Sequence, residues 1–489
     1  MFFIFFVSTV FFSSHYLTNW DAGQFALGTK NFDIGAHQPH PPGYFLYVYG
    51  AKALNFIFPN INTCFLIINF IAGALAIYFF YKLIFLISEN QKISFFIGLL
   101  LTANPAFWYY HNIANTYVFE ILAVCLAAFF TYKTILGDKN AFLFNAGAIA
   151  LIMGFRPSII LLAAPLLLIN IIFSKQKLKN LLLGAMIFAA VFAAWFIPFA
   201  SIAGFHNILS ATKSQASLSA GAFSKKSQLI FMAKSLLFCL NAAVIFFPFL
   251  IKQNIKFIAE KKLFYFLIPP AFLILFYSVV HFGEVGYGLG VIPIFLLFSI
   301  LPISRMMEKL KDRLLIYLVL AAQVCIFIWP LPAFDDQKIF KINYSSIKQT
   351  DSRIGNEVSL IAAQNPSLLI IILRGQYLDA ANQVRSYPND DIRILGYYLP
   401  GGKLYDFAGV IFEYSIIENY TSEKFHANCI SIPPDTSNIL ILADYLNPID
   451  YPDEFELTES RIPDSGQVYY TGSIENIDKF EFKGFYFNK

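Results

Sequence analysis

The sequence predicts an α-helical polytopic membrane protein that carries a small α/β domain at its C-terminal end. The 489 residues are 57% hydrophobic and 13% charged, whereas a typical soluble protein has about 25% charged residues. Apolar runs long enough to cross a bilayer recur along the chain up to about residue 331. Beyond about residue 333, charged residues are common and short apolar runs alternate with polar stretches, as in a soluble α/β domain.

About eleven apolar runs are candidate transmembrane helices, each close to the roughly 20 residues that a bilayer requires. They cover residues 1–16, 62–87, 92–106, 115–134, 141–155, 157–173, 180–203, 228–250, 263–281, 288–304 and 313–331. The fifth and sixth runs meet at Arg156, Pro157 and Ser158, which predicts a tight reversal or a break at one membrane face. We interpret the first run, which has no basic segment before it, as a transmembrane helix; a cleaved signal peptide is the alternative.

The distribution of Lys and Arg predicts the orientation of these helices. Alternate loops are rich in cations: Lys82 and Lys92; Lys133 and Lys139; Lys175, Lys177 and Lys179; Lys252, Lys256, Lys261 and Lys262; Arg305, Lys309, Lys311 and Arg313. The opposite loops carry fewer: Lys30 and Lys52; Arg156; Lys213, Lys225 and Lys226. By the positive-inside rule the first set is cytoplasmic. An odd number of spans then places the C-terminus outside.

This organisation predicts a transmembrane domain over residues 1–334, with a first outer loop at 17–61, and an extracytoplasmic α/β domain over residues 335–489. In the latter we expect strands in 367–375, 391–398 and 437–445, and helices in 351–364 and 376–387. This domain contains no nucleotide-binding fingerprint and no nucleophile motif. The five cysteines form no C-x-x-C pair and are interpreted as packing residues.

The first outer loop is unusually polar for this chain and begins "WDAGQFALGTKNFDIGAHQPHPPGY". Thr18 is the expected N-cap of a first helix, and Pro41 and Pro42 suit the first turn of a second, strongly apolar one. We expect both helices to lie along the membrane interface. Asp21 would then lie near a helix N-terminus, where it stays ionised and can accept a proton from a hydroxyl. A plain capping role for Asp21 is the alternative.

Other polar residues are predicted on the same outer face. They are His15, Asp33, His37, His40, His111, Arg156, His206, His281 and Glu284, with Glu120 about one turn into the fourth span. Ionisable groups at such depth are costly and point to a site, although exposed loops also tolerate polar residues. Asp33, His37 and His40 could ligate a metal, but no fourth ligand is evident. Hydrogen bonding to substrate or to the loop backbone is the other reading of these residues.

With this loop motif, "GFRPS" at 154–158 and a many-span core before an outer domain, the chain resembles the GT-C fold glycosyltransferases. This group includes the protein O-mannosyltransferases, the lipid A aminoarabinose transferases and the Rgt-like bacterial enzymes. The resemblance covers about residues 1–331 and is strongest in the first loop. It implies an enzyme that uses a polyprenyl-phosphate-linked sugar as donor, with Asp21 at the position of the catalytic base. Many relatives follow this aspartate directly with Glu, whereas this chain has Ala22, with Gln24 further on.

The residue chemistry suits this reaction, because a polyprenyl phosphate leaves without a general acid and needs one base and cationic stabilisation. Arg156 can pair bidentately with the phosphate, or it serves as a snorkelling anchor. Lys225 and Lys226 are further phosphate candidates. The expected substrate-binding residues are Gln24, Asp33, His37, His40, Glu120, His281, Glu284 and Tyr287.

The sequence therefore predicts an inverting glycosyltransferase of the bacterial inner membrane, with its active site and C-terminal domain on the periplasmic side. The expected partners are a polyprenyl-phosphate sugar, a lipid, glycan or protein acceptor, and membrane lipids, and no nucleic acid. No cofactor is expected, and a divalent metal is the minor alternative. The rival functions are a multi-span lipid or solute transporter, which places polar groups near the bilayer midplane, and a noncatalytic scaffold.

Overall fold

The computed structural model describes residues 1–173, 178–221, 225–250, 255–279, 283–308, 310–329, 342–362, 368–373, 376–378, 384–386, 391–400, 404–408, 413–426, 429–432, 434, 436–444, 456–461, 467–482 and 485–488. The chain forms two compact units. The first comprises Met1–Ser13 and Tyr44–Ile347, and the second comprises Ser14–Gly43 and Lys348–Lys489. Part of the first loop thus belongs to the same unit as the C-terminal region.

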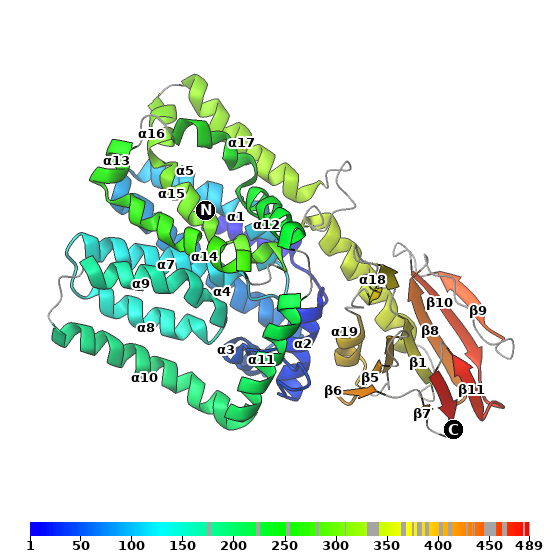
Figure 1. Ribbon diagram of the computed structural model, residues 1–489. Coiled ribbons are helices and arrows are strands. Elements are labelled where there is room, and N and C mark those ends of the chain that lie inside the picture. Colours follow the sequence, from blue (N-terminus) through cyan, green and yellow to red (C-terminus); the bar gives the residue numbers. More distant parts are fainter. Residues whose placement is uncertain are drawn as a thin grey trace. The chain divides into compact units, whose positions relative to one another are not determined.

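The described residues of the first unit form helices joined by turns and irregular segments (Figure 1). Its α-helices are α1 (Phe2–Phe12), α3 (Phe45–Leu54), α4 (Ile61–Ser88), α5 (Gln91–Thr102), α6 (Pro105–His111), α7 (Val118–Ile135), α8 (Ala141–Met153), α9 (Ile160–Phe173), α10 (Leu178–Ala203), α11 (Phe205–Gly221), α12 (Lys225–Leu240), α13 (Ile255–Glu260), α14 (Ile268–Val279), α15 (Val291–Phe298), α16 (Ile300–Glu308) and α17 (Leu310–Ile328). Four 3-10 helices join them: η1 (Pro157–Ile159), η2 (Asn241–Leu250), η3 (Leu263–Leu267) and η4 (Val285–Gly288). Helices α7, α8, α9 and α10 lie side by side in Figure 1.

Among the described residues, 4 helices are long and apolar enough to cross a membrane, or up to 6 if each of two bent pairs is one span. The bent pairs are α5 with α6, at 61°, and the segment Val285–Phe298 with α16, at 48°. Shorter apolar helices occupy Phe2–Phe12, Ala141–Met153, Pro157–Ile172, Leu263–Ser278 and Arg313–Ile328. Each of the predicted apolar runs coincides with one of these helices or bent pairs. The structure therefore confirms a mostly helical, multi-span membrane protein.

Asparagine side chains begin several helices. The side-chain oxygens of Asn60, Asn90 and Asn104 each accept two backbone N–H groups in the first turn of α4, α5 and α6. Such caps satisfy donors that have no partner within the helix. The predicted break after residue 155 is also present, because α8 ends at Met153 and η1 begins at Pro157.

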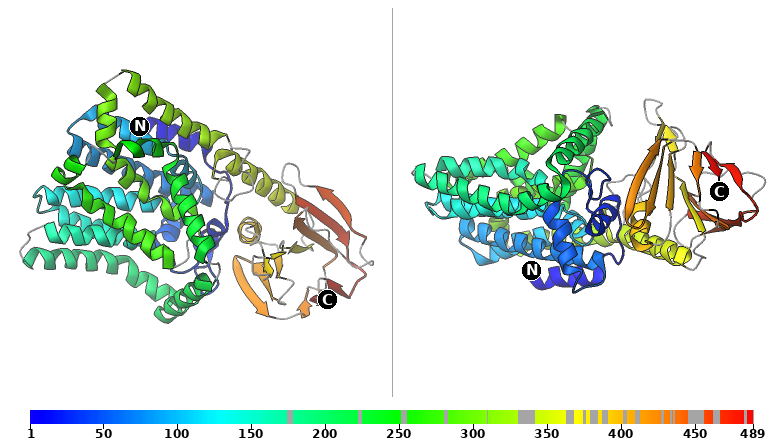
Figure 2. Two further views of the ribbon diagram at one scale, coloured as in Figure 1. Left: turned by 45° about the horizontal axis from the view of Figure 1, so that its top comes forward. Right: turned by 90° about the horizontal axis from the view of Figure 1, so that it is seen from below.

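In the second unit, the described residues form three α-helices and a mixed sheet (Figures 1 and 2). Its helices are α2 (Trp20–Lys30), most of α18 (Tyr344–Ala362) and α19 (Asp391–Tyr398). The 7-stranded sheet has the order β6-β5-β4-β1-β8-β10-β9, in which β1 is parallel to β4 and β8. These strands are β1 (Leu368–Leu373), β4 (Leu404–Ala408), β5 (Glu413–Glu418), β6 (Thr421–His426), β8 (Asn438–Asp444), β9 (Thr458–Arg461) and β10 (Gln467–Ser473). Strands β7 (Cys429–Ser431), β11 (Lys479–Phe482) and β12 (Phe485–Asn488) form a second sheet, and β2 (Gln376–Leu378) pairs with β3 (Val384–Ser386).

Alternating side chains of the central strands pack on the two faces of the sheet. Ile371 and Ile441 lie in one buried cluster, whereas their neighbours Ile370 and Leu440 lie in another. This alternation is the period-2 pattern of a strand. The second cluster also contains Leu27 of α2, which is 0% exposed. The first loop therefore contributes a helix to the hydrophobic core of the second unit.

Two details of the predicted loop are wrong. The N-cap of α2 is Asn19, whose side chain accepts the N–H of Ala22, and not Thr18. The second helix begins at Phe45 and not at Pro41. The residues before it adopt left-handed backbone, with φ of 111° at Gly43 and 44° at Tyr44, which a right-handed helix does not accommodate.

In the C-terminal region the structure has strands β1 and β8 and helix α18 at the predicted places. The predicted strand 391–398 is helix α19 instead, and the predicted helix 376–387 contains the paired strands β2 and β3. Short apolar runs do not distinguish a strand from a helix, and packing decides between them. In α19, Ile394 and Leu395 are both 0% exposed, so this segment is held by the core of the unit.

Candidate functional site

Asp21 lies in the first turn of α2, as the sequence predicts. Its side chain is 31% exposed, and Oδ1 lies 3.6 Å from Nδ1 of His40. Asp21 is therefore a partly exposed carboxyl group with a histidine beside it, accessible to a substrate hydroxyl.

The segment around His37 and His40 is folded by its own backbone. Asp33 and Gln38 form an isolated β-bridge, with N–H to O distances of 2.7 Å and 2.8 Å. Oδ1 of Asp33 accepts the N–H groups of Gly35 at 2.8 Å and Ala36 at 3.3 Å. Asp33 thus stabilises the turn that leads to the histidines. Within the described part of the chain, no three His, Cys, Asp or Glu side chains are grouped to hold a metal ion.

Gln24 lies one turn after Asp21 on α2 and is 0% exposed. Neither atom of its side-chain amide has a hydrogen-bond partner among the described residues. A buried amide without partners is costly. Gln24 is therefore a polar group that a bound hydroxyl or a water could satisfy.

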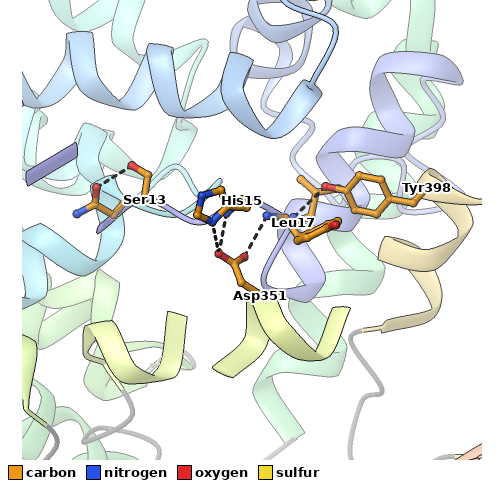
Figure 3. Close-up of polar contacts among 7 residues, drawn as sticks. Ser13, His15, Leu17, Asp351 and Tyr398 are labelled. Carbon is orange, nitrogen blue, oxygen red and sulfur yellow. Dashed lines mark hydrogen bonds and ion pairs between the residues drawn. The ribbon is translucent and has the colours of Figure 1, made fainter. Parts of the chain in front are cut away.

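Residues of the C-terminal region hold the chain that leads into α2, in contacts that the sequence did not predict. The carboxylate of Asp351, on α18, accepts the N–H of His15 at 2.7 Å and that of Tyr16 at 3.0 Å, and Nδ1 of His15 lies 3.1 Å from it (Figure 3). The hydroxyl of Tyr398, on α19, accepts the N–H of Leu17 at 3.1 Å (Figure 3). Burial raises the pKa of Asp351, while the hydrogen bonds from His15 and Tyr16 act to lower it.

Arg393 makes the corresponding contacts further along the loop. Its guanidinium carbon lies 4.8 Å from the centre of the Trp20 ring, and Nη1 donates to the carbonyls of Ala36 at 3.0 Å and His37 at 3.3 Å. Gln38 adds two contacts to the sheet region, donating to the carbonyl of Tyr420 at 2.6 Å and accepting the N–H of Ser422 at 3.4 Å. No local pattern marks these partners, since hundreds of residues separate them from the loop.

In the first unit, Arg156 is enclosed in a polar cluster. Its Nε donates to Oε1 of Glu120 at 2.7 Å, and its Nη1 donates to the hydroxyl of Thr116 at 2.7 Å. Ser158 donates to the same Glu120 oxygen at 3.0 Å. The guanidinium also lies 4.0 Å from the ring centre of Tyr117. These contacts use two of the five guanidinium N–H groups, so the cluster has further donors for an anion.

Further predicted residues lie near this cluster. The ring of Tyr287 is 5.5 Å from the Arg156 guanidinium and 5.4 Å from the ring of Tyr117. Glu284 precedes η4, in which Gly286 packs against Tyr117 so closely that a Cβ atom at this glycine would overlap the ring. Lys225 and Lys226 begin α12 and are both exposed. His281 lies outside the described residues.

Two polar residues of the predicted outer set have other surroundings. His111 is 0% exposed, with Nδ1 at 3.0 Å from the carbonyl of Phe107 and Nε2 at 3.2 Å from the hydroxyl of Thr9. His206 lies at the exposed start of α11.

The sequence matches no protein-family model and no curated protein. Its fold matches two crystal structures of ArnT from Cupriavidus metallidurans, each over 96% of both chains. The structure bound to undecaprenyl phosphate has a TM-score of 0.55 at 11% identity, and the apo structure has a TM-score of 0.57 at 12% identity. ArnT has the GT-C fold, so the predicted resemblance to this fold is confirmed over nearly the whole chain.

Proposed function

We propose that this chain is a membrane glycosyltransferase that moves a sugar from a polyprenyl-phosphate donor to an acceptor hydroxyl. The observation that carries the proposal is the partly exposed Asp21 carboxylate in the first turn of α2, beside His40. The likeness to ArnT supports it, because one of the ArnT crystal structures is bound to undecaprenyl phosphate.

In the proposed reaction, Asp21 accepts the proton of the acceptor hydroxyl as the oxygen attacks the anomeric carbon. The bond between this carbon and the phosphate oxygen breaks, and its electron pair leaves with polyprenyl phosphate. A single displacement inverts the anomeric configuration. No general acid is required, because the phosphate is already a good leaving group once cations stabilise its charge.

Arg156, Lys225 and Lys226 are the proposed contacts of the donor phosphate. Arg156 keeps N–H groups beyond those bound to Glu120 and Thr116, and Lys225 and Lys226 are exposed cations.

Gln24, His37, His40, His281, Glu284 and Tyr287 are the proposed contacts of sugar or acceptor hydroxyls. Glu120 and Asp33 act indirectly in this proposal. Glu120 orients Arg156, and Asp33 orients the turn before the histidines.

The proposal also includes the membrane arrangement. Each of about eleven apolar helices or bent pairs crosses the bilayer of a bacterial inner membrane. The loop with Asp21 and the C-terminal α/β domain, over residues 335–489, lie on the periplasmic side, as the distribution of Lys and Arg favours. The acceptor is a lipid, glycan or protein that carries a free hydroxyl.

The test uses the purified full chain in lipid nanodiscs, with a panel of undecaprenyl-phosphate sugars and a lipid extract of the native host as acceptor. We expect one donor to release undecaprenyl phosphate together with a product of inverted anomeric configuration. Asp21→Asn is expected to lower this rate by about 10²–10⁴-fold. Asp478→Asn removes an exposed carboxylate of the same unit and is expected to leave the rate unchanged.

Three outcomes contradict the proposal. Full activity in Asp21→Asn removes the assigned base, and a product of retained configuration removes the single displacement. Movement of an intact undecaprenyl-phosphate sugar across a proteoliposome membrane, without sugar transfer, indicates a transporter instead.

A further inference from the structure

We propose that Arg393 is a positioning residue for Asp21, so that α19 holds the catalytic carboxylate of the same unit in place. This inference rests on the proposed function, because it takes Asp21 to be the base. It gives helix α19 a role in the reaction itself.

Arg393 contacts residues next to Asp21 and residues close to His40 in the sequence. Its guanidinium stacks on Trp20, the residue directly before Asp21, at 4.8 Å from the ring centre. Its Nη1 donates to the carbonyls of Ala36 and His37, a few residues before His40. The planar guanidinium can stack and donate at once, whereas a lysine ammonium cannot reproduce this geometry. One side chain therefore links the N-terminal turn of α2 to the segment that carries His40.

The backbones of α2 and α19 also approach closely at this point. A Cβ atom on Gly23, two residues after Asp21, would lie 3.0 Å from both Cβ of Arg393 and N of Ile394. Further along α2, Leu27 shares a buried cluster with Leu395 of α19. The small residue at 23 lets α2 rest directly on α19. The position of α2 therefore depends on the helix that carries Arg393.

The burial of Arg393 assigns its role to positioning and not to substrate binding. The residue is 9% exposed. Its contacts include the Trp20 ring and two backbone carbonyls of the loop. Because the guanidinium donates to these loop carbonyls, we expect its loss to change where the loop lies. A misplacement of about 1 Å at a reacting group can cost roughly 100-fold in rate.

The test compares Arg393→Ala with the unaltered chain in nanodiscs, using the undecaprenyl-phosphate sugar that the unaltered chain transfers. We expect kcat to fall by about 10–100-fold while KM for the donor stays within about twofold. Hydrogen exchange is expected to rise in peptides covering 20–40 and to stay unchanged in α4 and α7. Lys479→Gln removes an exposed cation of the same unit and is expected to change neither measurement.

Arg393→Lys keeps the positive charge and most of the stem, which protects the fold if the alanine variant is poorly expressed. We expect an intermediate kcat and an intermediate exchange rate for this variant, because one ammonium cannot stack on Trp20 and bond both carbonyls. An unchanged kcat in both Arg393 variants would overturn the inference. So would a raised donor KM at unchanged kcat, which is the signature of a direct substrate contact.

Failure of the proposed function has a different signature. In that case the unaltered chain releases no undecaprenyl phosphate from any donor, or Asp21→Asn is fully active. The exchange measurement still decides whether Arg393 holds residues 20–40. Unchanged hydrogen exchange in Arg393→Ala refutes the positioning role of Arg393 independently of activity.

Discussion

Arg156 and Glu120 form an ion pair in which both side chains are only 3% exposed, with 2.7 Å between Nε and Oε1. The pair joins α7 to the break between α8 and α9, and Thr116 and Ser158 each add a hydrogen bond to it. A buried charge is tolerated when its partner is present, and removal of one partner leaves the other charge uncompensated. Arg156 thus has two roles in this region. It stabilises the fold through Glu120, and it is the proposed cation for the donor phosphate.

Glu120→Leu is expected to destabilise the protein strongly, because it leaves the Arg156 charge buried without its carboxylate. Loss of one partner of a buried pair costs about 3–5 kcal/mol. Thermal unfolding of the purified protein in detergent measures this effect. A melting temperature equal to that of the unaltered protein would contradict the interpretation of a buried, compensating pair.

The double variant Glu120→Leu/Arg156→Met separates the two roles of Arg156. Both charges are removed together, so stability is expected to return towards that of the unaltered protein. Sugar transfer is expected to be lost in this double variant, because the donor phosphate has lost its proposed cation. A double variant that is stable and fully active would refute the phosphate role of Arg156.

Asp351 is expected to give the second unit a measurable pH dependence. Burial raises its pKa above the ordinary value of 3.8, so the folded state binds this proton more tightly than the unfolded state does. The contribution of Asp351 to stability is therefore highest below pH 3.8 and falls as the pH rises from there through the raised pKa. Thermal unfolding in a pH series measures this slope.

Asp351→Asn cannot ionise, so it is expected to lack that slope. Its neutral amide, like the protonated carboxyl group, keeps one acceptor oxygen for the N–H groups of His15 and Tyr16, so its stability is expected to stay close to the low-pH level of the unaltered protein across the series. Asp478→Asn, at an exposed position, serves as the control and should keep the slope. The same slope in Asp351→Asn would assign it to another group.

Gly396→Ala is expected to displace α19, because a Cβ atom at this position overlaps the side chain of Ile417. Overpacking of this kind costs about 1–3 kcal/mol. Sugar transfer is expected to fall as well, since α19 carries Arg393. Ile417→Ala removes the obstructing methyl group, so the double variant should be less destabilised than the sum of the two single changes. Strict additivity would show that this contact does not limit the position of α19.

His40→Ala is expected to lower kcat by about tenfold, less than the loss in Asp21→Asn. His40 lies 3.6 Å from the Asp21 carboxylate, where it can orient this group without taking its proton. Asp21→Asn in the His40→Ala background should lower kcat further, because the base is still present in the single variant. A His40→Ala variant as inactive as Asp21→Asn would instead indicate that His40 is the base.

The sequence predicted the parts of the fold that depend on local composition. Long apolar runs identified the helices of the first unit, and the polar loop identified α2 with Asp21 in its first turn. Neighbouring candidates were harder to separate, because Thr18 and Asn19 both suit an N-cap and only the structure distinguishes them. The segment 391–398 was predicted as a strand but is helix α19, whose Ile394 and Leu395 are buried in the second unit.

The partners of the loop were beyond the reach of the sequence. Asp351, Arg393 and Tyr398 are ordinary polar residues in their local context, and their contacts join segments far apart in the chain. Similarly, the sequence suggested that Glu120 and Arg156 both face a site, but not that they bind each other. Such pairings are set by tertiary packing, which leaves no periodic pattern in one sequence.

The second unit is built from two segments, Ser14–Gly43 and Lys348–Lys489, which the ribosome makes at different times. At about 5–20 residues per second, the ribosome spends roughly 15–60 s on the stretch between these segments. During that time α2 is already made, while the helices and strands that bury it do not yet exist. A nascent chain therefore holds its proposed base on an unfastened loop until translation is nearly complete. A message truncated after α17 would give a set of membrane helices that cannot complete this loop.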